Sequence, residues 1–141
     1  MALLGRLVPV AFLLIAFLVA GCGQSELAKT TTYPAEGKVL IHGEPAAFVM
    51  VYLQPVDGGA GAEATGVTGE DGTFQLRTYS NEDFDGAVPG HYEVTLEPYD
   101  AVGAVAVPLP PGAKPTQLPK LDGKIVVEVK AENNNLEINI P

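Results

Sequence analysis

The chain of 141 residues has no tryptophan, a single cysteine and only two histidines. A lone cysteine excludes an internal disulfide and a thiolate zinc cluster, because both need more than one sulfur. Positive charge is also scarce, since 8 lysines and arginines stand against 17 acidic residues, for a net charge of −9. Nucleic acid is therefore excluded as a partner, because it binds basic surfaces. The imidazole bases are limited to His42 and His91, and no Gly-x-Ser-x-Gly elbow occurs.

Glycine and proline, in contrast, are abundant, with 16 and 12 residues. This density favours short strands with tight turns and disfavours a helical bundle. Alternation of apolar and polar residues predicts seven strands, at residues 35–42, 48–54, 64–68, 73–78, 91–97, 124–130 and 136–140. Short strands separated by turn residues predict an all-β fold, an antiparallel sandwich.

Several residues have predicted structural roles within these strands. Phe74 and Tyr92 are expected in the core, with the Tyr92 hydroxyl capping the backbone of a neighbouring loop. The sequence Asp71-Gly72 predicts a hairpin turn, because this pair adopts the turn that matches strand twist. Residues 98–123 are proline-rich without a period, so we expect an irregular connection there, with a short edge strand near 104–107.

The N-terminal segment has the features of an export signal. Arg6 precedes an apolar run at residues 7–20, whose 14 residues fall short of the roughly 20 needed to span a bilayer. That length is typical of a signal-peptide core. The sequence Leu18-Val19-Ala20-Gly21-Cys22 that follows resembles the bacterial lipobox. The resemblance implies cleavage before Cys22 and a covalent lipid on it. The alternative is an ordinary secretory peptide with a free cysteine.

The lipobox implies three parts. Residues 1–21 are the lipoprotein signal peptide, residues 22–33 a lipidated tether, and residues 34–141 the folded domain. The membrane is then a partner through the lipid on Cys22, which anchors the chain stably when more than one acyl chain is attached. The expected location is the cell envelope, anchored to a membrane and facing the periplasm or the exterior.

Three stretches of residues 34–141 combine turn and strand residues in a distinctive spacing. They are Glu36-Gly37-Lys38-Val39 with Gly43-Glu44-Pro45-Ala46, Thr68-Gly69-Glu70-Asp71-Gly72-Thr73-Phe74, and Pro89-Gly90-His91-Tyr92-Glu93-Val94-Thr95. They resemble the transthyretin-like (carboxypeptidase regulatory-like) domains of small bacterial lipoproteins of the planctomycete type. The resemblance implies a seven-stranded Greek-key sandwich with prealbumin-like topology. Residues 101–119 depart from the family's pattern.

The resemblance also bears on catalysis. Transthyretin-like relatives include a hydroxyisourate hydrolase, which uses several histidines and arginines. Here Arg77 is the only arginine beyond the signal segment. We therefore expect no enzyme, no catalytic residues, no metal site and no cofactor apart from the lipid on Cys22. The expected role is an interaction or structural module of the cell envelope.

The acidic loop at residues 79–89 is the candidate interaction site. Its eleven residues are many for a strand connection, and long loops on sandwiches often bind partners. Its candidate contact residues combine carboxylates with aromatic rings and are Tyr79, Glu82, Asp83, Phe84 and Asp85. An envelope protein or a glycan is the expected partner. A solvated linker without a partner explains the same composition equally well.

A ligand-binding lipoprotein is the alternative function, holding calcium, a glycan or a small molecule in the loops. The loop aromatics that could line a pocket are Tyr79, Phe84 and Tyr99. The spacing Asp83-x-Asp85-Gly86 resembles the start of a calcium loop. The twelfth position is Val94 in place of a bidentate glutamate, so any calcium site is expected to be weak. An accessory domain for an enzyme on another chain is a third interpretation.

Overall fold

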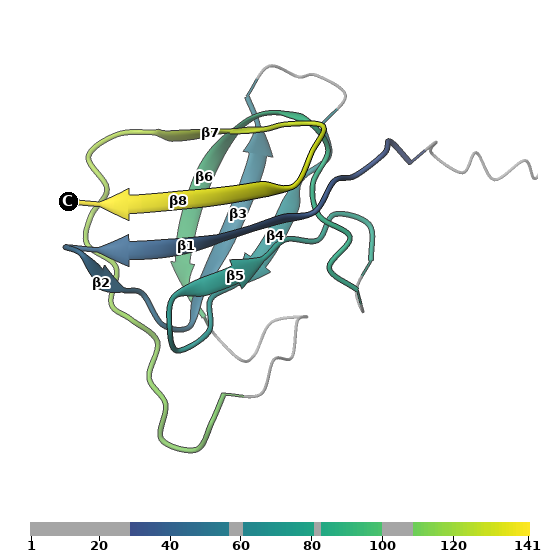
Figure 1. The fold of residues 1–141 in the computed structure, drawn as a ribbon. Coiled ribbons are helices and arrows are strands. Elements are labelled where there is room, and N and C mark those ends of the chain that lie inside the picture. The colour runs from purple at the N-terminus through teal and green to yellow at the C-terminus, as the bar shows by residue number, and fades with distance from the viewer. Residues whose placement is uncertain (1–28, 57–60, 81–82, 100–108) are drawn as a thin grey trace, which may run out of the picture.

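Every regular element of the computed structural model is a strand (Figure 1), within the residues that it describes, 29–56, 61–80, 83–99 and 109–141. The strands are β1 (Ala35–Ile41), β2 (Glu44–Pro45), β3 (Val49–Pro55), β4 (Ala64–Val67), β5 (Thr73–Gln75), β6 (Gly90–Pro98), β7 (Ile125–Val129) and β8 (Asn134–Ile140). The predicted all-β fold is confirmed.

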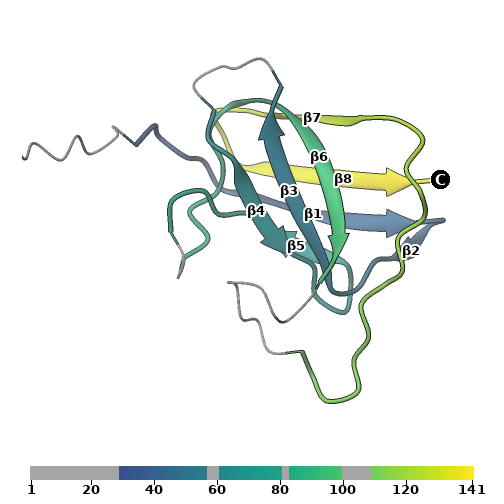
Figure 2. The same cartoon turned by 180° about the vertical axis from the view of Figure 1, so that it is seen from behind.

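The strands form two sheets, which we call the β1 sheet and the β3 sheet. In the β3 sheet the order is β4-β3-β6-β7, so β3 lies inside its sheet. In the β1 sheet, β8 pairs with β1 over its full length, and β2 and β5 therefore share the other edge of β1. The β1 sheet faces the viewer in Figure 1, and the β3 sheet faces the viewer in Figure 2, which is seen from behind. The strands of the β3 sheet run across those of the β1 sheet.

The core lies between the two sheets, because alternate residues of each strand face inward. From the β1 sheet the buried side chains include Val39, Ile41, Phe74, Leu136, Ile138 and Ile140; from the β3 sheet they include Val49, Val51, Leu53, Tyr92, Val94 and Leu96. The prediction that Phe74 and Tyr92 lie in the core is confirmed, with exposed fractions of 3% and 0%.

Each of the seven predicted ranges overlaps a strand, but several boundaries differ. The strand expected at 73–78 ends at Gln75, as β5. β2 lies between the first two predicted strands, where none was expected, and β8 begins at Asn134, before the predicted range 136–140. Phe48 was expected in the second strand, yet it precedes β3 with a φ of 54°, which a pleated strand does not allow. Asn134 explains one difference, because its side-chain amide donates to the carbonyls of Lys130 and Glu132 at 3.0 and 2.6 Å and closes the turn itself.

The pairing of β1 with β8 is parallel, and it runs from Ala35 opposite Asn134 to Ile41 opposite Ile140. The other strand pairs of the described residues are antiparallel, as the sequence predicts. Parallel neighbours need a long crossover, which the rest of the domain provides. The first and last strands of the fold are thus joined side by side.

The predicted turn at Asp71-Gly72 is present, but its two arms belong to different sheets. β4 pairs with β3, whereas β5 pairs with β1, and the arms meet in an isolated bridge between Thr65 and Arg77. The turn chemistry is as expected, since the Asp71 carboxylate accepts the backbone N–H and the hydroxyl of Thr73 at 3.1 and 2.6 Å. These hydrogen bonds lower the pKa of Asp71. The turn therefore carries the chain from one sheet to the other.

The proline-rich connection contacts the sandwich along its described part, residues 109–123. Thr116 exchanges two hydrogen bonds with the backbone of Ala47, at 2.9 and 2.8 Å. Leu118 and Leu121 pack against the core. The edge strand expected at 104–107 lies outside the described residues, as do the predicted signal peptide and Cys22. No helix long and apolar enough to cross a membrane occurs in the part of the chain that is described.

Candidate functional site

The base of the 79–89 loop is fixed by the carboxylate of Asp85. One oxygen, Oδ1, accepts the backbone N–H of Thr78 at 2.7 Å, and Oδ2 accepts that of Tyr79 at 2.9 Å. The Thr78 hydroxyl returns a 2.8 Å hydrogen bond to the carbonyl of Gly86. A carboxylate that accepts two backbone donors bends the chain locally, as Asx turns do. Asp85 therefore closes the loop.

The second half of the loop is built into the domain. Ala87 and Tyr33 form a bridge with hydrogen bonds of 2.9 and 3.0 Å, which ties the loop to the segment before β1. Gly86 has a φ of 84°, and a Cβ there would collide with the Tyr33 carbonyl, so only glycine fits. The hydroxyl of Tyr92 donates to the carbonyl of Val88 at 2.6 Å, as the sequence predicted. Residues 86–88 are thus buried framework.

The exposed tip contains Asp83 and Phe84. The Phe84 side chain is 56% exposed, an unusual state for a large aromatic ring. The Arg77 guanidinium carbon lies 5.9 Å from the centroid of its ring, within cation–π range. The backbone N–H of Asp83 donates to the Ser80 hydroxyl at 2.9 Å. The tip therefore presents an aromatic side chain on a hydrogen-bonded support.

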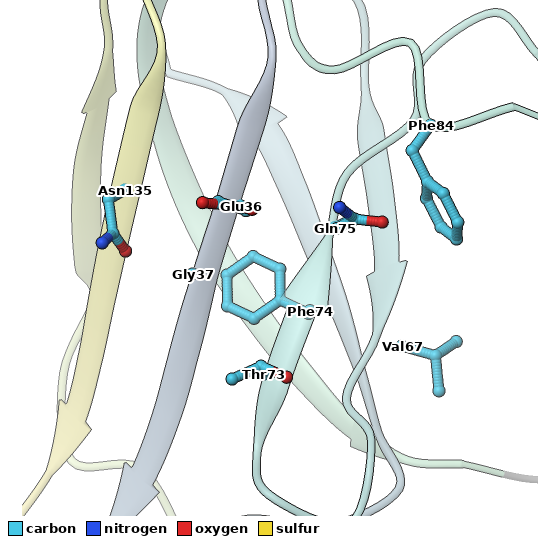
Figure 3. A pocket seen from close by; sticks show the side chains of 8 residues that line it. All are labelled: Glu36, Gly37, Val67, Thr73, Phe74, Gln75, Phe84 and Asn135. Atoms are coloured by element: carbon cyan, nitrogen blue, oxygen red, sulfur yellow. The ribbon is translucent and has the colours of Figure 1, made fainter.

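A groove lies beside Phe84 on the outer face of the β1 sheet. It consists of two adjoining hollows of about 460 and 230 Å³, which share Glu36, Gln75 and Phe84. Figure 3 shows Glu36, Gln75 and Asn135 on three neighbouring strands, β1, β5 and β8, with Phe84 projecting from the loop. We call this depression the Phe84 groove; its other lining residues include Thr73, Phe74, Val67 and Asn133.

The floor of the Phe84 groove depends on a close approach between β1 and β5. Gly37 lies opposite Phe74 in the register of these strands. A Cβ at residue 37 would come within 2.7 Å of the Phe74 ring, and closer still to the carbonyl of Leu136. The absent side chain lets the ring lie directly beside Gly37 (Figure 3). The floor is therefore made of packed backbone and a core aromatic ring.

The N-terminal segment contacts the other side of the loop. The backbone N–H of Thr30 donates to the Tyr79 hydroxyl at 3.2 Å, and the Lys29 Nζ lies 5.8 Å from the Tyr79 ring centroid. Beside these contacts lies a hollow of about 470 Å³, which is lined by residues 29–32, Tyr79, Ser80 and Asp85. Tyr79 thus faces the end of the predicted tether and lies away from the Phe84 groove.

The structure divides the predicted contact residues into two groups. Asp85 and Tyr79 take part in local hydrogen bonds, whereas Asp83 and Phe84 are exposed at the tip. Glu82 lies outside the described residues. Tyr99, predicted to line a pocket, is only 4% exposed, because its backbone bonds to Phe48 at the end of β6 and holds it against the domain.

Sequence reasoning missed the groove residues on the strands. Glu36, Gln75 and Asn135 occupy outward positions next to buried neighbours, which is also the pattern of any solvated strand face. These residues can be recognised as a group only when the strand register is known, because the register brings their amide and carboxylate groups side by side near the aromatic loop residue.

The side chains that could hold a metal or act as acid–base groups are spread over the described part of the domain. Within the described ranges, no three histidine, cysteine, aspartate or glutamate side chains cluster as metal ligands do. His42 follows β1 and His91 lies in β6, so the two imidazoles belong to different sheets, and both are exposed. Burial, and to a lesser degree the nearby Tyr79, raise the pKa of Tyr92, which holds this phenol in its neutral, donating form.

Comparison with known proteins adds no relative: no protein-family model, no curated protein and no solved structure matches this chain.

Proposed function

We propose that this chain is a lipid-anchored lipoprotein of the cell envelope, non-enzymatic, whose β-sandwich is an interaction module. The single observation that carries the proposal is the exposed Phe84 ring beside a groove on rigid strands. Exposed aromatic rings are the side chains that most often anchor binding partners. A loop whose base is fixed presents such a ring with little loss of conformational entropy.

The anchoring part of the proposal rests on the lipobox sequence that ends in Cys22. The non-enzymatic part rests on the residue inventory, since a general base and a nucleophile must lie within hydrogen-bond reach of each other. The two exposed histidines on different sheets lack that arrangement.

We also propose that the fold has Greek-key, prealbumin-like topology. Two features support it. The chain passes between sheets at the β2–β3, β4–β5, β5–β6 and β7–β8 connections, as Greek-key sandwiches do. In addition, a tyrosine whose hydroxyl bonds to the backbone a few residues upstream, as Tyr92 does with Val88, recurs in immunoglobulin-like sandwiches.

The test is crosslinking in intact cells, followed by recovery of the protein and its attached molecules. A loop variant replaces Glu82, Asp83 and Phe84 with serine and glycine but keeps Asp85, because Asp85 holds the loop base. Val126→Ala is the matched control, since Val126 is 53% exposed on β7 of the other sheet. Cys22→Ala serves as the unanchored control. Equal recovery of partners by the wild type and a folded loop variant would reject the interaction role.

A ligand-binding function is the second candidate, and the Phe84 groove favours it. Its two hollows place polar groups of neighbouring strands beside one aromatic wall, and polar groups at fixed positions give a ligand site its orientation and specificity.

A further inference from the structure

The two hollows of the Phe84 groove form one elongated depression, because Glu36, Gln75 and Phe84 line both. One hollow extends towards Val67 and Thr73, and the other towards Asn133 and Pro34. A depression that continues past its aromatic wall in two directions suits an extended ligand with repeating units better than a compact one.

Its polar lining consists mainly of uncharged groups. The amides of Gln75, Asn133 and Asn135 each offer a donor and an acceptor. The Thr73 hydroxyl offers an acceptor only, because its proton is donated to the Asp71 carboxylate. Paired donor and acceptor groups match adjacent hydroxyls on a sugar ring, where each hydroxyl both donates and accepts. Gln75 and Asn135 lie on strands, which hold such groups in place better than loops do.

From this arrangement we propose that the Phe84 groove binds a neutral oligosaccharide. The Phe84 ring stacks on the C–H face of a pyranose ring, and Gln75, Asn135 and Glu36 hydrogen-bond to its hydroxyls. This inference rests on the proposed interaction function and names the chemical class of its partner.

The charge of the groove favours a neutral ligand over a charged one. Among the residues that the structure describes, Glu36 is the one charged residue that lines either hollow. An anionic ligand is disfavoured by that carboxylate and by the chain's net charge of −9. A single carboxylate among amides is also a weak site for a basic peptide, whose recognition needs several opposite charges.

The position of the groove disfavours a peptide added as a further strand. The groove lies on the face of the β1 sheet, where β1 already has neighbours on both edges. A peptide on this face finds side chains only, without the backbone ladder that gives strand addition its affinity.

The experiment uses the full chain in mild detergent with purified maltohexaose, cellohexaose, chitohexaose and xylohexaose. The readout is the side-chain amide NMR signals of Gln75 and Asn135. We expect saturable shifts of these signals with at least one hexaose, at a millimolar or lower Kd. If no hexaose gives a saturable shift up to about 10 mM, well above the Kd expected for one stacked ring, the proposal is overturned.

Variants at Phe84 distinguish ring stacking from simple apolar contact. Phe84→Ala should weaken the Kd about tenfold, which corresponds to about 1.4 kcal/mol. Phe84→Trp should retain binding, whereas Phe84→Leu should weaken it like alanine, because leucine keeps apolar bulk without a flat face. Val126→Ala, the matched control, should bind as the wild type does. Undiminished binding by Phe84→Leu would show that the ring does not stack on a sugar, and would overturn the assignment.

Salt and cellular capture separate the remaining outcomes. The Kd for a neutral sugar should stay constant between about 50 and 500 mM NaCl, whereas a charged ligand loses affinity as screening increases. A strong loss of affinity in salt contradicts the neutral assignment. If every hexaose fails while crosslinking in cells still captures a partner that depends on Phe84, this inference falls and the interaction role stands. If that capture fails too, both fall.

Discussion

The hydroxyl of Tyr92 and the carbonyl of Val88 are joined by a 2.6 Å hydrogen bond inside the domain, where Tyr92 has no exposed surface. The bond connects the start of β6 to the end of the 79–89 loop. Tyr92→Phe leaves the Val88 carbonyl without this donor, so we expect a loss of about 1–3 kcal/mol in the free energy of unfolding. Urea denaturation measures it. Tyr52→Phe, on the outer face of β3, should change stability by less than about 0.5 kcal/mol.

The same tyrosine predicts an alkaline limit to stability. Its pKa lies above the ordinary value of 10.0, first because of burial and second because of Tyr79. A raised pKa in the folded state means that the contribution of Tyr92 is complete below that ordinary value and is lost as pH rises through the folded pKa. Denaturation midpoints of the wild type should therefore fall more steeply above pH 10 than those of Tyr92→Phe. Parallel curves for the two proteins would contradict this assignment.

Phe74 is a core residue whose loss should strongly destabilise the domain. Phe74→Ala removes a ring that packs over Gly37, and substitutions of this kind cost about 3–5 kcal/mol. That loss is comparable to the whole stability of a small domain, about 5–15 kcal/mol. Calorimetry should show a greatly lowered Tm or no transition. Phe84→Ala is the matched control, because its 56% exposed ring contributes little to folding.

Asp85 and Asp83 should respond differently to the same substitution. Asp85→Ala removes the acceptor of two backbone N–H groups, at Thr78 and Tyr79, and should cost about 1–3 kcal/mol. Asp83→Ala changes an exposed side chain and should stay within about 0.5 kcal/mol. Hydrogen exchange of the Thr78 and Tyr79 amides tests the local effect. Similar stability of the two variants would show that Asp85 does not hold the loop.

Cys22 carries the anchoring prediction. Cells that express the wild-type chain with a clickable fatty-acid analogue should yield a labelled mature protein in the membrane fraction. Cys22→Ala should abolish the label and block normal lipoprotein maturation. A mature wild-type protein without label would make the lipobox interpretation wrong.

The strands could be predicted because apolar residues alternate with polar ones where one face of a strand is buried, and this alternation is visible in the sequences of β6 and β8. Which strands pair could not be predicted in this way, since the apolar pattern of β1 would be the same beside β8 as beside any other strand. Phe84 could be singled out because an aromatic residue in an acidic loop is unusual. The role of Asp85 could not, because an aspartate that accepts backbone hydrogen bonds resembles a solvated one until the loop is folded.

The parallel pairing of β1 and β8 also determines how the domain resists force. The N-terminal end of β1 and the C-terminal end of β8 lie at opposite ends of the paired region, from Ala35 opposite Asn134 to Ile41 opposite Ile140 (Figure 1). A pull on the chain's two ends therefore shears the two strands along their length. All the hydrogen bonds between them bear the strain together, whereas in a peeling geometry they would break one by one. A domain loaded in this way therefore stays folded under a tension that would unzip a terminal hairpin.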